Sequence, residues 1–196
     1  MKFEKLTGKE LITTGIFTAV YLVIYIVISI AMGMVPIASM FMNFASSAVL
    51  GIPMMIYMNK INKFGMLTLT YLIGGLAMIL FGVGWFALPG GVIAALIGEY
   101  ITASGKYHDT KKNILAYAIC CVGSNANILY WAVGSERFMK EHAEAVGQGY
   151  MDTILGYFAN GWVMPVIILS SFIGGIIGGY IGSRSLKRHF ERSGLI

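Results

Sequence analysis

Charged residues are scarce in this chain. Its 196 residues include only 14 lysines and arginines and 9 aspartates and glutamates, whereas hydrophobic residues make up 57% of the sequence. The charged share of 12% is about half of the share that is usual in a soluble globular domain. This composition excludes an ordinary soluble domain and predicts an integral membrane protein.

Cysteine and histidine are scarce as well. Cys120 and Cys121 are neighbours in an apolar segment, where they cannot easily bridge each other, and we expect them to be small packing residues. The three histidines, His108, His142 and His189, all fall in loops or in the tail. Because no zinc-ligand spacing and no acid–base pair remains inside the apolar segments, the sequence predicts no metal, no cofactor and no enzyme activity.

Long uncharged runs cover residues 11–59, 64–98, 113–135 and 153–183. A bilayer-spanning helix needs roughly 20 apolar residues, so the first run is long enough for two helices and the last two runs for one each. The second run provides two helices if it continues past Glu99. We therefore predict an all-α integral membrane bundle of six transmembrane helices, which forms a single domain over residues 1–196. The expected spans are 11–31, 37–58, 64–81, 89–105, 113–133 and 162–183.

The basic residues lie at the ends of the apolar runs and not along one exposed face, which argues against nucleic acid as a partner. Twelve of the fourteen fall on one side of an even-numbered bundle, and only Arg137 and Lys140 fall on the other. By the positive-inside rule, this distribution predicts that both the N- and C-termini are cytoplasmic.

The segment 134–161 is the one long external connection. It begins with charged residues and becomes apolar from Ile154 to Phe158. Its first part is typical of a solvated helix, and its second part of an interfacial helix or an early extension of the last span. Since long loops in compact proteins are usually functional, we interpret this segment as a lid.

Glu99 is the one ionisable residue inside a predicted span. Such residues often mark functional sites. Glu99 lies near the cytoplasmic end of its span, however, within reach of Lys106 or another lysine of the inner face. The sequence leaves both interpretations open, a structural ion pair and a functional carboxylate.

Polar side chains gather in the outer half of the predicted span 113–133. Ser124, Asn127 and Trp131 are spaced at i, i+3 and i+7, which places them on one helical face, and Asn125 and Tyr130 lie beside that face. An amide offers donors and an acceptor to a ligand, and we expect Asn127 to do so. Asparagine also joins helices in membrane bundles, so helix contact stays open as the alternative.

Three further candidates for substrate binding fall on the same external side. Asn160 and Trp162 begin the last span, and Trp85 lies in the turn before the fourth. Tryptophan at the membrane surface is explained equally by a lined cavity and by the aromatic belt of membrane proteins.

Small residues four positions apart mark helix faces that touch another helix closely. Gly15 and Ala19 form such a step in the first span, and Gly174, Gly178 and Gly182 form a row in the last.

The sequence resembles the substrate-binding S components of energy-coupling factor (ECF) transporters. The resemblance lies in the lysines at its start, the Gly15–Ala19 step, six predicted spans in fewer than 200 residues and an elaborated external side. The sequence looks most like their Trep_Strep group, found in bacteria. In S components an Ala-x-x-x-Ala motif of the first helix packs on the coupling helices of the T component, and here glycine replaces the first alanine. The resemblance implies that Gly15 and Ala19 contact this partner.

The resemblance also implies the function. S components bind a micronutrient externally, with the loop between helices one and two and the outer parts of helices four to six, and deliver it by toppling in the membrane. The chain lacks a Gly-x-x-x-x-Gly-Lys-Ser/Thr phosphate loop, so a T component and two ATPase subunits would supply the energy.

We thus expect a multi-pass S component of an ECF-type ABC importer in the bacterial cell membrane, which captures a vitamin-like or other micronutrient small molecule. A vitamin, a modified base and a porphyrin-like compound all stay open. The alternative is a non-transporting membrane scaffold or accessory subunit, in which the polar residues only hold helices together.

Overall fold

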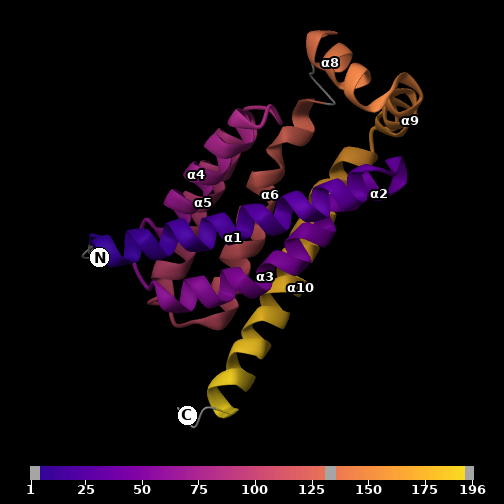
Figure 1. The fold of residues 1–196 in the computed structure, drawn as a ribbon. Helices are drawn as coiled ribbons and strands as arrows, with labels where there is room; N and C mark the ends of the chain where they lie inside the picture. Colours follow the sequence, from indigo (N-terminus) through magenta and orange to yellow (C-terminus); the bar gives the residue numbers. More distant parts are fainter. Residues whose placement is uncertain (1–4, 131–135, 193–196) are drawn as a thin grey trace.

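The computed structural model describes residues 5–130 and 136–192 as a bundle of helices (Figure 1). In chain order the elements are α1 (Gly8–Gly33), α2 (Pro36–Met40), α3 (Met42–Lys60), α4 (Met66–Leu80), α5 (Ala87–Ser104), α6 (Thr110–Ser124), the 3₁₀ helix η1 (Asn125–Leu129), α8 (Glu136–Val146), α9 (Gln148–Phe158) and α10 (Val163–Arg192). The start of α1 and the end of α10 lie at one end of the bundle, and α8 and α9 lie at the other (Figure 1). We call the latter the α8–α9 end.

The prediction of an all-helical membrane bundle is confirmed for the described residues. Each predicted span overlaps one of the helices α1, α3, α4, α5, α6 and α10. In the described part of the chain, α1, α5 and α10 are long and apolar enough to cross a membrane, and α4 is a shorter apolar helix.

The predicted span 37–58 is divided into two helices. Pro36 begins the short helix α2, as the missing N–H of proline is tolerated in the first helical turn, and α3 starts only after Phe41. The backbone at Phe41 leaves the helical region, with φ −98° and ψ 1°. The break gives the chain between α1 and α3 room to form part of a cavity wall.

The predicted span 113–133 is also not one continuous α-helix. Helix α6 ends at Ser124, and the chain continues as the tighter helix η1. The sequence here contains Gly123, Asn125 and Asn127 besides the serine, and these residue types stabilise helix interiors poorly because their side chains are absent or bond to nearby backbone.

Glycine brings α10 against α3. A Cβ atom at Gly178 would lie 2.5 Å from the carbonyl oxygens of Ser47 and Ala48, and one at Gly174 or Gly182 would meet the backbone of α3 just as closely. A second glycine row on the neighbouring face contacts α6. The expectation that this face of the last span touches another helix is therefore confirmed.

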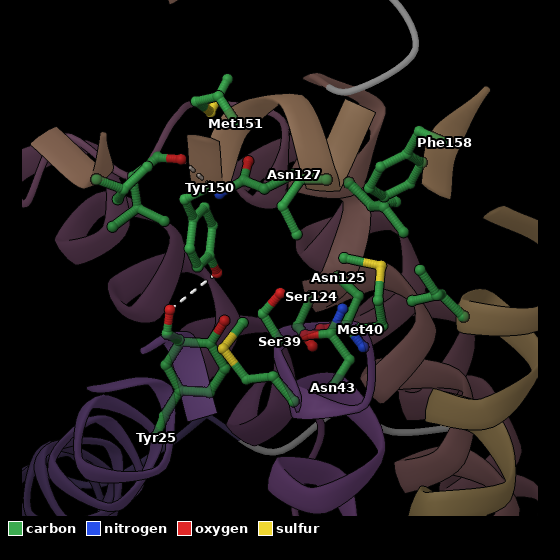
Figure 2. A pocket seen from close by; sticks show the side chains of 17 residues that line it. Tyr25, Ser39, Met40, Asn43, Ser124, Asn125, Asn127, Tyr150, Met151 and Phe158 are labelled. Carbon is green, nitrogen blue, oxygen red and sulfur yellow. Dashed lines mark hydrogen bonds between the residues drawn. The ribbon is translucent and has the colours of Figure 1, made fainter. Parts of the chain in front are cut away.

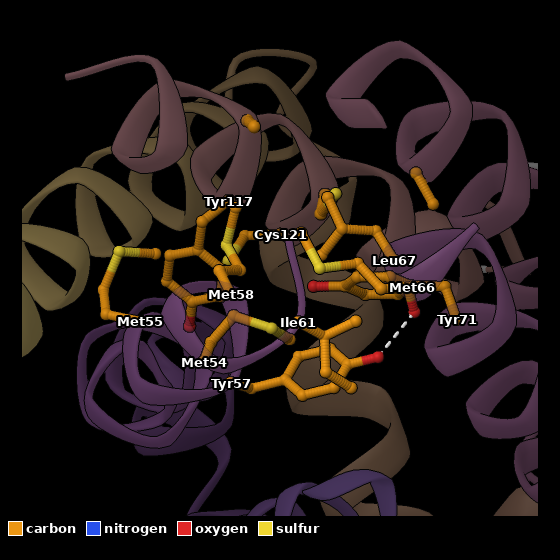
Figure 3. Packing of buried hydrophobic residues seen from close by; sticks show 13 residues of the cluster. Met54, Met55, Tyr57, Met58, Ile61, Met66, Leu67, Tyr71, Tyr117 and Cys121 are labelled. Atoms are coloured by element: carbon orange, nitrogen blue, oxygen red, sulfur yellow. Dashed lines mark hydrogen bonds between the residues drawn. The ribbon is translucent and has the colours of Figure 1, made fainter. Parts of the chain in front are cut away.

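A core of methionine, tyrosine and small side chains joins α3, α4 and α6 (Figure 3). Met58 and Leu67 in this core are completely buried. The hydroxyl of Tyr57 lies 2.8 Å from the carbonyl oxygen of Met66 and 3.0 Å from Oγ1 of Thr14. This hydroxyl therefore connects α3 with the beginning of α4 and with α1.

Glu99 is buried in the same region and binds the start of α4. Its Oε1 accepts hydrogen bonds from the backbone N–H groups of Gly65, Leu67 and Thr68 at 2.9, 2.7 and 3.2 Å. The first N–H groups of a helix have no partner inside the helix and carry partial positive charge, so a carboxylate satisfies them. The sequence left open an ion pair with Lys106 or another lysine of the inner face, and the structure shows backbone donors holding this carboxylate instead.

Candidate functional site

A cavity of about 300 Å³ lies at the α8–α9 end, between α1, α2, α3, η1, α9 and α10 (Figure 2). We call it the main cavity. Its polar side chains are those of Tyr25, Ser39, Asn43, Ser124, Asn125, Asn127 and Tyr150, and apolar side chains complete the wall. Among the residues that the structure describes, no charged side chain lines it. The arrangement is typical of a small-molecule site, which combines apolar walls with a few polar groups.

Helix α9 covers one side of the main cavity. Met151 and Ile154 of α9 are buried in its wall. The hydroxyl of Tyr150 donates a hydrogen bond to the carbonyl oxygen of Gly33, the last residue of α1, at 2.8 Å (Figure 2). The segment 134–161 thus contains a charged helix followed by a more apolar one, as predicted, and the second helix contributes to the wall.

Asn125 contributes the most deeply buried amide of the main cavity. Its side chain is only 8% exposed, and its Nδ2 has no hydrogen-bond partner in the structure. Figure 2 shows it together with Ser124, Ser39 and Asn43, which come from three different helices. Because an unpaired buried amide is costly, this donor is suited to bind an acceptor atom of a ligand.

Asn127 also lines the main cavity, but both ends of its amide are bound to backbone. Its Oδ1 accepts the N–H of Ala87 at 2.8 Å, and its Nδ2 donates to the carbonyl oxygen of Val83 at 3.3 Å. These bonds fix the connection between α4 and α5. The amide that we expected to face a ligand at Asn127 is therefore occupied, and Asn125 provides the free donor.

Tyr130 and Trp85 support the same connection and lie outside the walls of the main cavity. The backbone N–H of Trp85 donates to the Tyr130 hydroxyl at 3.1 Å. Between them, the ring of Phe86 stacks on Trp85 with centroids 4.4 Å apart and meets Tyr130 edge-on at 4.7 Å. Trp131, the third aromatic candidate of this region, lies outside the described residues.

Asn160 and Trp162 line a second cavity of about 140 Å³ between α2, the end of α9 and the start of α10. The amide of Asn160 donates to the carbonyl oxygens of Gly156 and Tyr157 at 3.2 and 3.4 Å. Trp162 is largely exposed. We call the 140 Å³ space the second cavity. Since it shares Met40 with the main cavity, the two spaces are neighbours.

Four polar residues of the main cavity were not among the sequence candidates. Tyr150 comes from the predicted lid, and Tyr25, Ser39 and Asn43 come from the first two spans. Asn43 had a usable signal, because it is the only amide between residues 11 and 58. Ser39 and Tyr25 had none, since serine and tyrosine are common in membrane helices.

Metal chemistry finds no support in the described part of the chain. No group of three His, Cys, Asp or Glu side chains that could hold a metal ion occurs there. Cys120 and Cys121 are free and buried, and the thiol of Cys120 lies 3.7 Å from the carbonyl oxygen of Ala94, which fits the packing role expected from the sequence.

The Gly15–Ala19 step lies on an exposed face of α1. Both residues are exposed, and a Cβ atom at Gly15 would have no atom within 4 Å. Ile12 and Ile16 beside them are also largely exposed. Unlike the glycine row of α10, this step therefore meets no other described helix of its own chain.

A model of the family described as hypothetical bacterial integral membrane protein (Trep_Strep) matches residues 8–192. No curated protein and no solved structure matches the chain. The match spans all of the helices described above, and together with the apolar helices it makes the chain a multi-pass protein of the bacterial cell membrane.

Proposed function

The chain belongs to the Trep_Strep family of bacterial integral membrane proteins, and we propose that it is the substrate-binding S component of an ECF-type ABC importer. In this proposal it captures a micronutrient small molecule from outside. A T component and two ATPase subunits then drive delivery to the cytoplasm.

The main cavity is the observation that carries the proposal. It combines a space of about 300 Å³ with amide, hydroxyl and thioether groups and has no charged side chain among its described lining residues. A scaffold that only holds helices together needs no such space, and the described lining offers an enzyme no carboxylate, histidine, lysine or cysteine. Capture of a small molecule is the activity that these side chains support best.

The proposed orientation places six spans in the membrane with both termini in the cytoplasm and the α8–α9 end outside. The distribution of basic residues supports it, because the described lysines of the connections 61–65 and 105–109 lie at the opposite end of the chain's helices from the main cavity. Helix α9 then covers an externally open site, and Tyr150 fastens it to α1.

The exposed step on α1 supports the proposed partner. Small residues on a membrane helix let a second helix approach closely, and no described part of this chain occupies the face at Gly15. A coupling helix of a T component would fill it.

Co-expression with a T component and its two ATPase subunits tests this assignment. We expect the wild-type chain to co-purify with them and Gly15→Leu to be lost from the complex. Gly74→Leu is the matched control, because Gly74 of α4 also has no atom within 4 Å of a built Cβ. Failure of the wild type to assemble, or equal loss in both variants, would contradict the proposed contact.

A further inference from the structure

We propose that the two cavities bind the two ends of one ligand: an uncharged head that accepts a hydrogen bond from Asn125, and an apolar arm that extends past Met40 into the second cavity. This inference rests on the proposed function, because it names the class of molecule that the S component captures. Its two halves are carried by different observations.

The head is uncharged because nothing described in the main cavity compensates a charge. Its described lining offers amides, hydroxyls, thioethers and hydrocarbon, but no carboxylate, ammonium or guanidinium group. An ion that leaves water for such a site loses its hydration without gaining a partner. A neutral polar group loses far less.

The head carries an acceptor because the buried polar atom that lacks a hydrogen-bond partner in the described wall of the main cavity is a donor. Nδ2 of Asn125 is buried and without a partner, while the amide of Asn127 is occupied at both ends. A carbonyl or ring-nitrogen acceptor on the ligand would pair the donor of Asn125.

The arm is apolar because the second cavity is lined almost entirely by hydrocarbon. Ile37, Phe41, Val163 and Val166 contribute to its wall, and the amide of Asn160 is already bound to backbone carbonyls. The hydroxyl of Ser170 is likewise bound, to the carbonyl oxygen of Ile167, so a polar arm would find few partners there to replace its hydration.

Both ends belong to one ligand because the two cavities are neighbours. Met40 and Ile167 line both. A methionine side chain is unbranched and adapts its shape easily, so it can yield to an arm that extends from one space into the other. The alternative occupant of the second cavity is a lipid acyl chain, which the experiment below separates.

The volumes limit the ligand's size. Taking about 30 Å³ for a small group such as one water molecule in the liquid, the main cavity holds a head of roughly ten non-hydrogen atoms and the second cavity an arm of about four carbons. Benzamide and N-butylbenzamide match these dimensions, and benzoate is the charged counterpart of the head. These three compounds are the probes.

Dissociation constants are measured for the three probes with purified protein in lipid nanodiscs, after subtraction of partitioning into protein-free nanodiscs. We expect N-butylbenzamide to bind about 250-fold more tightly than benzamide, since each of the four buried carbons contributes a factor of about four. Benzoate should bind more weakly than benzamide.

Two variants separate the two halves of the proposal. Asn125→Asp replaces the donor by an acceptor of the same shape and should weaken both amides at least tenfold. Ser170→Leu adds bulk to the wall of the second cavity and should remove the advantage of the butyl group while leaving benzamide binding unchanged. Leu169→Phe, at a largely exposed neighbouring position, is the control and should change neither. Melting temperatures measured on the same samples show that each variant is folded.

Benzoate binding as tightly as benzamide would overturn the uncharged head. The proposed apolar arm would be overturned if N-butylbenzamide bound no more tightly than benzamide, as expected if a lipid chain fills the second cavity. It would also be overturned if the tighter binding of N-butylbenzamide survived in Ser170→Leu. If neither amide binds, the proposed ligand class fails. The proposed function then still stands if the protein retains another small molecule from the cell, and both fail if it retains none.

Discussion

Replacing Glu99 by alanine tests whether this buried carboxylate is structural. The change removes the acceptor of three backbone N–H groups at the start of α4. Leu67 is fully buried, whereas Gly65 and Thr68 are half-buried, so water reaches the latter two more easily. With a cost of about 1–3 kcal/mol for an orphaned buried donor, we expect Glu99→Ala to lower the free energy of unfolding by about 3 kcal/mol.

Glu99→Gln is the matched variant, because it keeps a carbonyl oxygen where Oε1 lies, removes the charge, and changes only Oε2, which has no hydrogen-bond partner in the structure. We expect it to lose about 1 kcal/mol, the usual difference between a charged and a neutral hydrogen bond. Unfolding is followed by circular dichroism during titration with sodium dodecyl sulfate in mixed micelles, and ligand binding is measured on the same samples. Unchanged stability in Glu99→Ala would refute the structural role, and lost ligand binding with unchanged stability in Glu99→Gln would make this carboxylate functional.

Four further changes test other parts of the structure. Gly178→Leu should prevent folding or lower the melting temperature strongly, since its side chain would collide with carbonyl oxygens of α3; a stable variant would contradict the packing of α10. Asn127→Ala should lower the free energy of unfolding by about 1–2 kcal/mol and leave ligand affinity unchanged. A tenfold weaker affinity at an unchanged melting temperature would show instead that this amide binds the ligand. Tyr150→Phe removes the bond between α9 and α1 and should accelerate ligand release about fivefold, which stopped-flow measurement of the dissociation rate checks. Glu141→Cys should react with a membrane-impermeant thiol reagent only from outside, and labelling from the cytoplasmic side would overturn the proposed topology.

The helices could be predicted from the sequence because membrane helices depend on long apolar runs and on the positions of charged residues. The row of Gly174, Gly178 and Gly182 likewise predicted a close helix contact, as small residues have few other uses at that spacing. The same rule failed for Gly15 within the chain, because the sequence does not say whether the touching helix belongs to the same molecule.

The site could be predicted only in part. Ser124, Asn125 and Asn127 do line the main cavity, but their order of importance differs from the expected one because α6 ends at Ser124 and a 3₁₀ helix rotates the following side chains. Which amide is free depends on backbone groups some 40 residues away, at Val83 and Ala87. Such long-range partners leave no local sequence pattern.

The central claim is that the main cavity holds a small molecule, and native mass spectrometry of the protein released from its own membranes tests it most directly. The spectrum of the wild-type protein should show the additional mass of a bound, uncharged small molecule. Ser39→Trp should lack this mass while melting at a similar temperature, because an indole at this half-buried position of α2 would fill the main cavity. A wild-type protein without any bound mass, or a mass retained equally by Ser39→Trp, would contradict the account.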